Sequence, residues 1–164
     1  MKDTLLQALT LVSALGCGLV AGVFFAFSTF VMKALARLPA GQGIAAMQSI
    51  NVTVINPLFM GAIFGTAVTC VLVAITALRS WHEPGAVYLL VGSLLYLVGT
   101  VGVTIVFSVP LNNALAAVGP ESGGGASLWV RYVAAWTGWN HVRTVAALAA
   151  AASLTVALWM APGG

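Results

Sequence analysis

Charged side chains are scarce in this sequence. Only 5% of its 164 residues are Asp, Glu, Lys or Arg, whereas 61% are hydrophobic. An ordinary soluble domain carries about 25% charged residues, and a chain with so few cannot cover a water-facing surface. The composition therefore excludes a typical soluble fold and predicts one integral membrane domain over residues 1–164.

Basic clusters, paired carboxylates and metal-ligand motifs are also missing. The net charge of +3 rests on scattered cations, which excludes a nucleic-acid surface. Cys17 and Cys70 lie singly inside apolar runs, so we expect packing roles for both. Without an acid cluster or a second nearby histidine, a protein-ligated metal is not expected, although haem needs only one axial histidine.

Long apolar runs dominate what remains. Four of them reach the about 20 residues that a helix needs to cross a bilayer. Backbone groups in lipid must be paired within their own segment, so each run is predicted to be a helix. The fold class is therefore an all-α four-helix transmembrane bundle with spans at about 5–32, 57–78, 86–109 and 141–160.

The connections between these spans differ in length. Segments 33–56 and 110–140 are long and lie on one side of the membrane, the loop side, whereas residues 79–85 form a short turn on the other. Short interfacial helices are predicted at 43–51 and along the aromatic stripe 129–140, whose tryptophans we expect at headgroup depth. More Lys and Arg flank the loop side, which favours a cytoplasmic loop side in a bacterial plasma membrane.

Small residues recur at every fourth position of the first two spans. Such stripes let helix backbones approach closely in lipid, and we expect them to pack the bundle. The same stripes also suit contacts between copies of the chain in a homo-oligomer. They consist of Ala14, Gly18, Gly22 and Ala26 in the first span and Gly61 and Gly65 in the second.

Polar and aromatic residues gather at the loop-side ends of the spans. Because successive spans run in opposite directions, segments far apart in the sequence deliver amides, an imidazole, a guanidinium and indoles to one layer. Polar groups at this depth are costly unless they have a function. We therefore predict one enclosed site formed by Asn51, Asn56, Asn112, Trp136, Trp139, Asn140, His141 and Arg143.

His141 and Arg143 carry the strongest chemistry in this set. A histidine is the natural general base near neutral pH, and a buried arginine keeps its proton and needs an anion. On a continuous helix, Trp136, Asn140 and Arg143 share one face and His141 points elsewhere. A helix break at Gly138 would give His141 another direction, and the sequence leaves both arrangements open.

Five segments of the sequence resemble the anthrone oxygenase family, a set of small four-helix membrane proteins. The resemblance spans nearly the whole chain, and its most specific part is the Trp-Asn-His-x-Arg stretch. It implies oxygenation of an anthrone, a tricyclic phenol-ketone, to an anthraquinone with molecular oxygen and no organic cofactor. The segments are Gly22–Ser28, Met47–Asn51, Asn56-Pro57, Pro110–Asn112 and Trp136–Thr144.

The resemblance also suggests a role for each candidate residue. His141 would remove a proton from the substrate, and Arg143 with the amides Asn112 and Asn140 would stabilise the oxyanion. Trp136 and Trp139 would supply flat apolar walls for a small phenolic substrate. Two alternatives remain open, namely a haem- or quinone-binding redox protein and a non-enzymatic membrane bundle.

Overall fold

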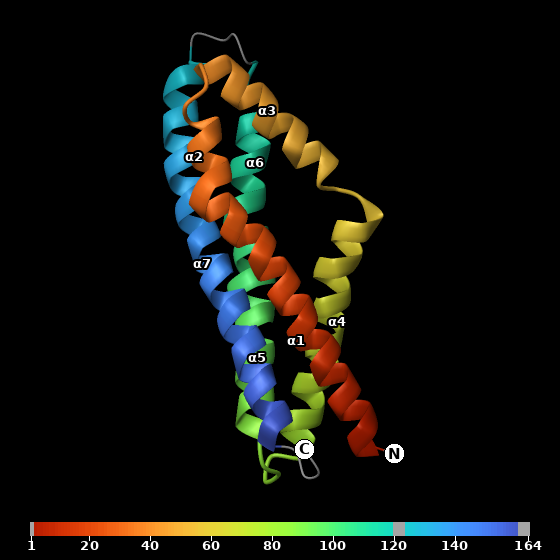
Figure 1. Ribbon diagram of the computed structural model, residues 1–164. Coiled ribbons are helices and arrows are strands. Elements are labelled where there is room, and N and C mark those ends of the chain that lie inside the picture. Colours follow the sequence, from red (N-terminus) through yellow and green to blue (C-terminus); the bar gives the residue numbers. More distant parts are fainter. Residues whose placement is uncertain (1, 120–123, 161–164) are drawn as a thin grey trace.

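The computed structural model describes residues 2–119 and 124–160, and within them every regular element is a helix. Four helical segments are long and apolar enough to cross a membrane, and they stand side by side in a bundle (Figure 1). The predicted all-α four-helix membrane architecture is therefore confirmed. The four segments are Thr4–Leu35, Pro57–Arg79, Ala86–Ala116 and Gly125–Met160.

Two of the four segments change helical pitch along their length. The first and third contain π-helical stretches, in which an extra residue per turn widens the helix, and such stretches are frequent at functional sites. The first runs through α1 (Lys2–Ala26), η1 (Phe27–Val31) and α2 (Met32–Leu35). The third runs through α5 (Ala86–Tyr96), η2 (Leu97–Gly102), η3 (Thr104–Ser108) and α6 (Val109–Ala116).

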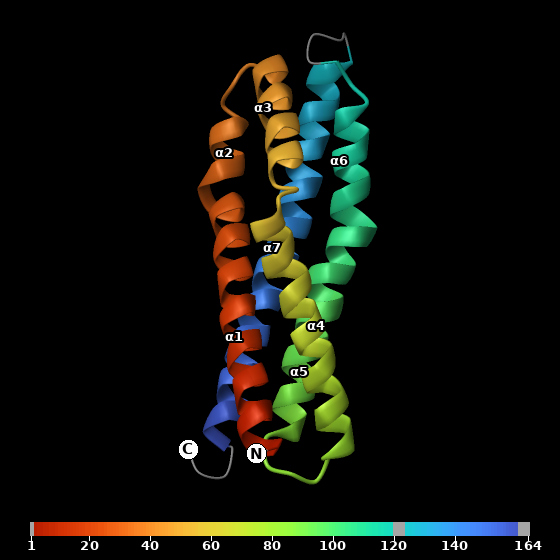
Figure 2. The same ribbon diagram turned by 90° about the vertical axis from the view of Figure 1, so that its right-hand side faces the viewer.

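The remaining helices complete the bundle. Helix α4 (Pro57–Arg79) forms the second segment, and the uninterrupted α7 (Gly125–Met160) forms the fourth. Helix α3 (Ala40–Thr53) joins the first segment to the second. Figure 2 shows α3 beside α7 and α6 at one end of the molecule, with the α4–α5 turn at the opposite end.

The main apolar core lies among α1, α4, α5 and α7. Close backbone approach occurs where Gly92 and Gly99 face α7, because a Cβ at either position would meet Leu154 or Ala146. The glycines of the predicted stripes behave differently, since a Cβ on Gly18, Gly22, Gly61 or Gly65 would meet no atom within 4 Å. The prediction that these glycines pack the helices of one bundle is therefore wrong.

Helix α3 was predicted over 43–51 and is a longer helix that packs within the molecule. Its Ile44 and Met47 are buried in a second apolar cluster with residues of α2, α6 and α7. The Gln48 amide nitrogen donates to the carbonyls of Leu115 and Val118 at 2.9 and 3.0 Å, which caps the end of α6. Helix α3 thus closes one end of the bundle.

The aromatic stripe at 129–140 belongs to α7 and does not form a separate helix, so the fourth segment starts 16 residues before the predicted His141. Trp129 and Trp136 are 4% and 6% exposed and pack in the second apolar cluster. These two rings therefore pack against other helices and are not lipid-facing anchors, whereas their depth in the membrane stays a prediction. Burial of large aromatic rings against α3 extends the core past the predicted span.

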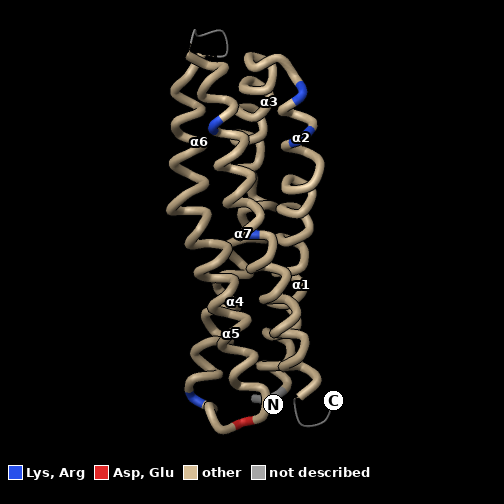
Figure 3. The backbone as a smooth tube through the Cα atoms, turned by 90° about the vertical axis from the view of Figure 1, so that its left-hand side faces the viewer, with Lys and Arg blue, Asp and Glu red and all other residues tan. Residues whose placement is uncertain are grey.

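The charged residues are distributed unevenly along the bundle. Figure 3 shows Lys and Arg near the α2–α3 end and at the start of α7, with one basic and one acidic position in the α4–α5 turn. A further basic position of α7 lies about halfway along the bundle. The Lys and Arg residues near the α2–α3 end and at the start of α7 lie on the side that was predicted to be cytoplasmic, and that orientation stays a prediction. The isolated basic position of α7 belongs to the candidate site.

Candidate functional site

A cavity of about 310 Å³ lies between α1, α3, α4, α7 and the η3–α6 stretch. Its volume falls at the lower end of the about 300–1,000 Å³ range of small-molecule sites. Most of its wall is apolar or aromatic, with a few polar groups from different helices. The polar or indole-bearing lining residues are Asn51, Thr104, Ser108, Asn112, Trp136 and Arg143.

Among the described residues that line this cavity, Arg143 alone is charged, and it is 4% exposed. Its Nη2 donates to Asn140 Oδ1 at 2.6 Å, and its Nη1 donates to Thr104 Oγ1 at 3.3 Å. The guanidinium carbon lies 4.3 Å from the ring centroid of Phe24 and 5.1 Å from that of Trp136. The two rings face the cation at distances where cation–π attraction is significant.

A network of neutral groups holds Arg143 in this position. Asn140 is fully buried, and its Nδ2 donates to the Phe24 carbonyl and to Ser28 Oγ, both at 2.7 Å. Ser28 in turn lies 3.1 Å from Thr144 Oγ1. Both N–H groups of the Asn140 amide donate to residues of the first helical segment. The amide oxygen is therefore fixed toward Arg143.

Among the side chains that the structure describes, those of residues 4–119 and 124–160, no carboxylate forms an ion pair with Arg143. Glu83 lies in the α4–α5 turn at the far end of the bundle (Figure 3). The guanidinium has five N–H groups, of which its neutral neighbours use two, and Nε has no partner. A buried cation with spare donors and no counter-charge among the described side chains is suited to an anionic ligand.

Asn112 occupies another part of the cavity wall. Its Oδ1 accepts hydrogen bonds from the Tyr132 hydroxyl at 2.9 Å and from Trp136 Nε1 at 3.0 Å. Trp136 also packs against Phe27, with ring centroids 5.7 Å apart. These contacts fix the indole of Trp136 between the Asn112 amide and the Arg143 guanidinium as a rigid flat wall.

The cavity opens on one side to the outer surface of the bundle. Four large apolar lining residues are also exposed: Ile55, Phe64, Ile105 and Val109. They come from the α3–α4 connection, α4, η3 and α6. The exposed rim is therefore apolar, which suits a ligand that reaches the cavity from lipid.

Four predicted site residues do not line this cavity, namely Asn56, Trp139, Asn140 and His141. His141 is exposed on α7, because the helix continues through Gly138 and turns the imidazole away from the face that carries Asn140 and Arg143. The expectation that it shares one enclosed site with Arg143 is wrong. Neither His82 nor His141 is among the residues that line the cavity.

Trp139 and Asn56 also have other roles. Trp139 stacks on Phe107, with ring centroids 3.6 Å apart and planes 9° apart, and it is not a cavity wall. Asn56 caps α4, since its Oδ1 accepts from the Phe59 backbone nitrogen at 3.0 Å. The placement of both in the shared site is therefore wrong, whereas Asn51, Asn112, Trp136 and Arg143 line it and Asn140 supports it.

Two polar residues of the site were missed in the sequence. Thr104 bonds Arg143, and Ser108 lines the cavity with a buried hydroxyl that has no hydrogen-bond partner. With Asn112 they recur at every fourth position, which is one face of a helix. That spacing was a readable signal, but Thr104 and Ser108 lie within a long apolar run.

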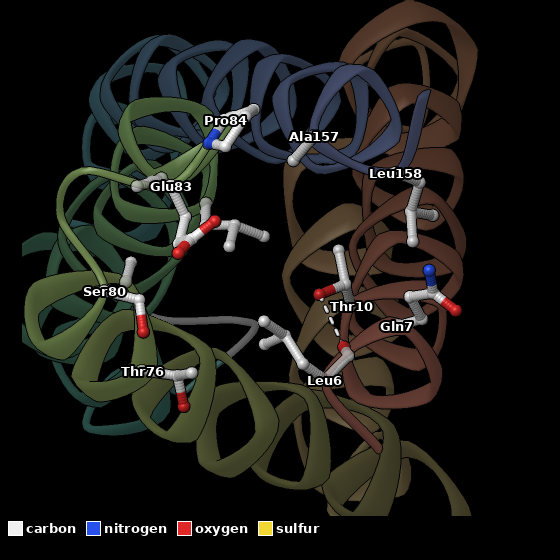
Figure 4. Close-up of a pocket in the computed structure, with 12 residues that line it drawn as sticks. Leu6, Gln7, Thr10, Thr76, Ser80, Glu83, Pro84, Ala157 and Leu158 are labelled. Carbon is white, nitrogen blue, oxygen red and sulfur yellow. Dashed lines mark hydrogen bonds between the residues drawn. The ribbon is translucent and has the colours of Figure 1, made fainter. Parts of the chain in front are cut away.

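A second cavity of about 400 Å³ lies at the opposite end of the bundle (Figure 4). Its described lining contains Glu83 but no aromatic residue and no cation. The hydroxyls of Thr10 and Thr76 are already bonded to carbonyls of their own helices at 2.8 and 2.9 Å. The cavity beside Arg143 is therefore the better candidate site.

Comparison with known proteins identifies the family of the chain. The family model of anthrone oxygenase matches residues 56–153, which is more than half of the chain and includes Asn112, Trp136, Asn140 and Arg143. Comparisons with curated proteins and with solved structures gave no match. The extent of the family match is sufficient to conclude that this chain belongs to the anthrone oxygenase family.

Proposed function

We propose that the protein oxygenates a flat phenolic ketone of the anthrone type, whose anion is stabilised by Arg143 in the cavity. One observation carries the proposal: a buried arginine, without a carboxylate partner among the described side chains, lines an apolar cavity of small-molecule size. Membership of the family supports the reaction class. The indole of Trp136 and the ring of Phe24 supply the flat contacts that a fused-ring substrate requires.

The proposed reaction begins with loss of a proton from the ring methylene of the substrate. The resulting anion is delocalised onto the ketone oxygen, which accepts hydrogen bonds from Arg143. The carbon of the former methylene then forms a bond with molecular oxygen, and protonation gives a hydroperoxide. Loss of water from this hydroperoxide leaves a second ketone, so one substrate and one O₂ give one quinone and one water.

Arg143 acts electrostatically in this scheme. Fixed donors aimed at a developing oxyanion stabilise it strongly in a water-poor site. The bond from Asn140 holds the guanidinium in place before the substrate arrives, so little reorganisation is needed. Stabilising the anion lowers the free energy of the carbon acid's ionisation, and electron-rich anions of this kind react with oxygen directly.

The scheme assigns no step to His141. Its side chain is exposed on the outer face of α7, whereas the substrate would lie against Arg143. A general base must come within hydrogen-bond reach of the proton that it removes, directly or through one water. We therefore propose that water entering with the substrate accepts the methylene proton. Stabilisation of the resulting anion by Arg143 lowers the free energy of this ionisation.

The test uses the purified protein in detergent with anthrone as substrate. Quinone formation is followed by absorbance and oxygen uptake by an electrode, with the Arg143→Met variant at equal concentration as the measure of spontaneous oxidation. We expect a protein-dependent rate with one O₂ consumed per quinone formed. A wild-type rate equal to that of the variant, or to buffer alone, would overturn the proposed function.

A further inference from the structure

The orientation of the Asn112 side chain is fixed by its neighbours. Its Oδ1 accepts from Tyr132 Oη and from Trp136 Nε1. An indole N–H can only donate, so the amide oxygen must face Trp136 and the amide nitrogen must point elsewhere. Asn112 therefore offers the rest of the cavity a donor.

This donor is free in the described structure. No residue of the ranges 2–119 and 124–160 accepts a hydrogen bond from Asn112 Nδ2, although the residue is only half-buried and lines the cavity. The amide nitrogen is also not among the enclosed unpaired polar atoms. It is thus accessible and unpaired on a residue that lines the cavity, so a ligand bound there can supply its acceptor.

Asn112 and Arg143 mark two separate polar points on an apolar wall. Thr104, which bonds Arg143, lies eight residues before Asn112 on the same helical segment, so about two helical turns separate these two positions. The apolar Ile105 and Val109 line the cavity between them, together with the single hydroxyl of Ser108. One ligand that spans the cavity can therefore bind the Arg143 cation through one oxygen and the neutral Asn112 donor through another.

We propose that Asn112 is a specificity-determining residue that binds a neutral acceptor oxygen of the substrate, away from the anionic oxygen held by Arg143. The ligand class is a fused-ring aromatic with two separate oxygen functions, one anionic and one a carbonyl or ether-like oxygen. The assignment rests on the proposed function, because it requires the anion to bind at Arg143. A flat hydrocarbon with a single anionic group would leave the Asn112 donor unpaired.

Two unreactive probes separate these contributions. Anthracene-2-carboxylate has an anionic group and no other oxygen, and anthraquinone-2-carboxylate has the same skeleton with two added carbonyls. We expect the wild-type protein to bind the quinone probe about fivefold more tightly, the worth of about one neutral hydrogen bond. Affinities are measured by fluorescence or absorbance titration of the detergent-solubilised protein.

The Asn112→Asp variant tests the donor specifically. It keeps the oxygen that Tyr132 and Trp136 need, and it replaces the amide nitrogen with an oxygen. We expect the fivefold preference to vanish at neutral pH and to return as the introduced carboxyl becomes protonated and can donate again. The matched control is Asn113→Asp on the exposed neighbour, which should keep the wild-type preference at every pH.

The outcomes are distinguishable. If Asn112→Asp keeps the wild-type ratio of the two affinities at neutral pH, or if Asn113→Asp loses that ratio, Asn112 does not bind the neutral oxygen of the ligand. If both probes bind wild type equally, the assignment is likewise overturned while the anion site stands. If neither probe binds, or if Arg143→Met leaves both affinities unchanged, the proposed function itself is overturned and this assignment with it.

Discussion

Replacing Arg143 with methionine removes the cation of the cavity but keeps an unbranched side chain in its place. The change deletes the hydrogen bonds to Asn140 and Thr104 and the contacts of the guanidinium with the Phe24 and Trp136 rings. Removal of one preorganised oxyanion donor lowers kcat by about 10²–10³, which is about 2.7–4 kcal/mol. We expect a loss of at least about 10² in the rate of quinone formation.

The same substitution should leave the stability of the bundle nearly unchanged. Asn140 Oδ1 loses its donor, which costs about 1–3 kcal/mol. Against this, the variant no longer buries a guanidinium that lacks a carboxylate partner among the described residues, which removes a desolvation cost of similar size. The thermal unfolding midpoint should therefore stay within a few degrees of wild type, so the lost activity cannot be ascribed to unfolding.

The assay compares Arg143→Met with Arg131→Met, because Arg131 is an exposed arginine on the same helix. Initial rates of anthrone oxidation and unfolding midpoints are measured for both proteins in the same detergent. We expect the rate to fall for Arg143→Met alone. A rate above half of wild type for Arg143→Met, or an equal loss for both variants, would refute the electrostatic role.

Three further predictions follow from positions outside the anion site. His141→Ala should keep the rate within about twofold of wild type because the imidazole is exposed, and a tenfold loss in the same assay would contradict this. Gly43→Ala should lower stability by about 1–3 kcal/mol, because its Cβ would lie 2.7 Å from the buried Trp129 ring. Its control Gly61→Ala, in open space, should be neutral or stabilising by about 0.5–1 kcal/mol in thermal unfolding. Asn56→Ala should cost about 1 kcal/mol as a lost cap while leaving probe affinity unchanged, and a selective loss of affinity would restore Asn56 to the site.

Much of the fold could be predicted because lipid imposes simple constraints. The length of each apolar run and the need to pair backbone groups determine that four helices form. The π-helical stretches and the uninterrupted α7 were not predictable, because both depend on tertiary packing around residues such as Phe27 and Trp129. The glycine stripes were misleading, since the spacing of small residues does not say which helix face meets a neighbour.

The candidate site was predicted in part. Helical spacing places Trp136, Asn140 and Arg143 on one face, and the structure keeps that face inward. The direction of His141 depended on whether α7 breaks at Gly138, a choice that burial of the aromatic stripe decides and that local sequence does not. Asn56 was misassigned because an asparagine before a proline suits a helix cap as well as a binding site.

The most direct test is an experimental structure of the protein with anthraquinone-2-carboxylate bound. We expect the rings to lie in the cavity against Trp136, with a carboxylate oxygen within hydrogen-bond distance of the Arg143 guanidinium. A ligand seated instead in the cavity beside Glu83, or on the outer surface with Arg143 still bonded only to Asn140 and Thr104, would contradict an anion site at Arg143.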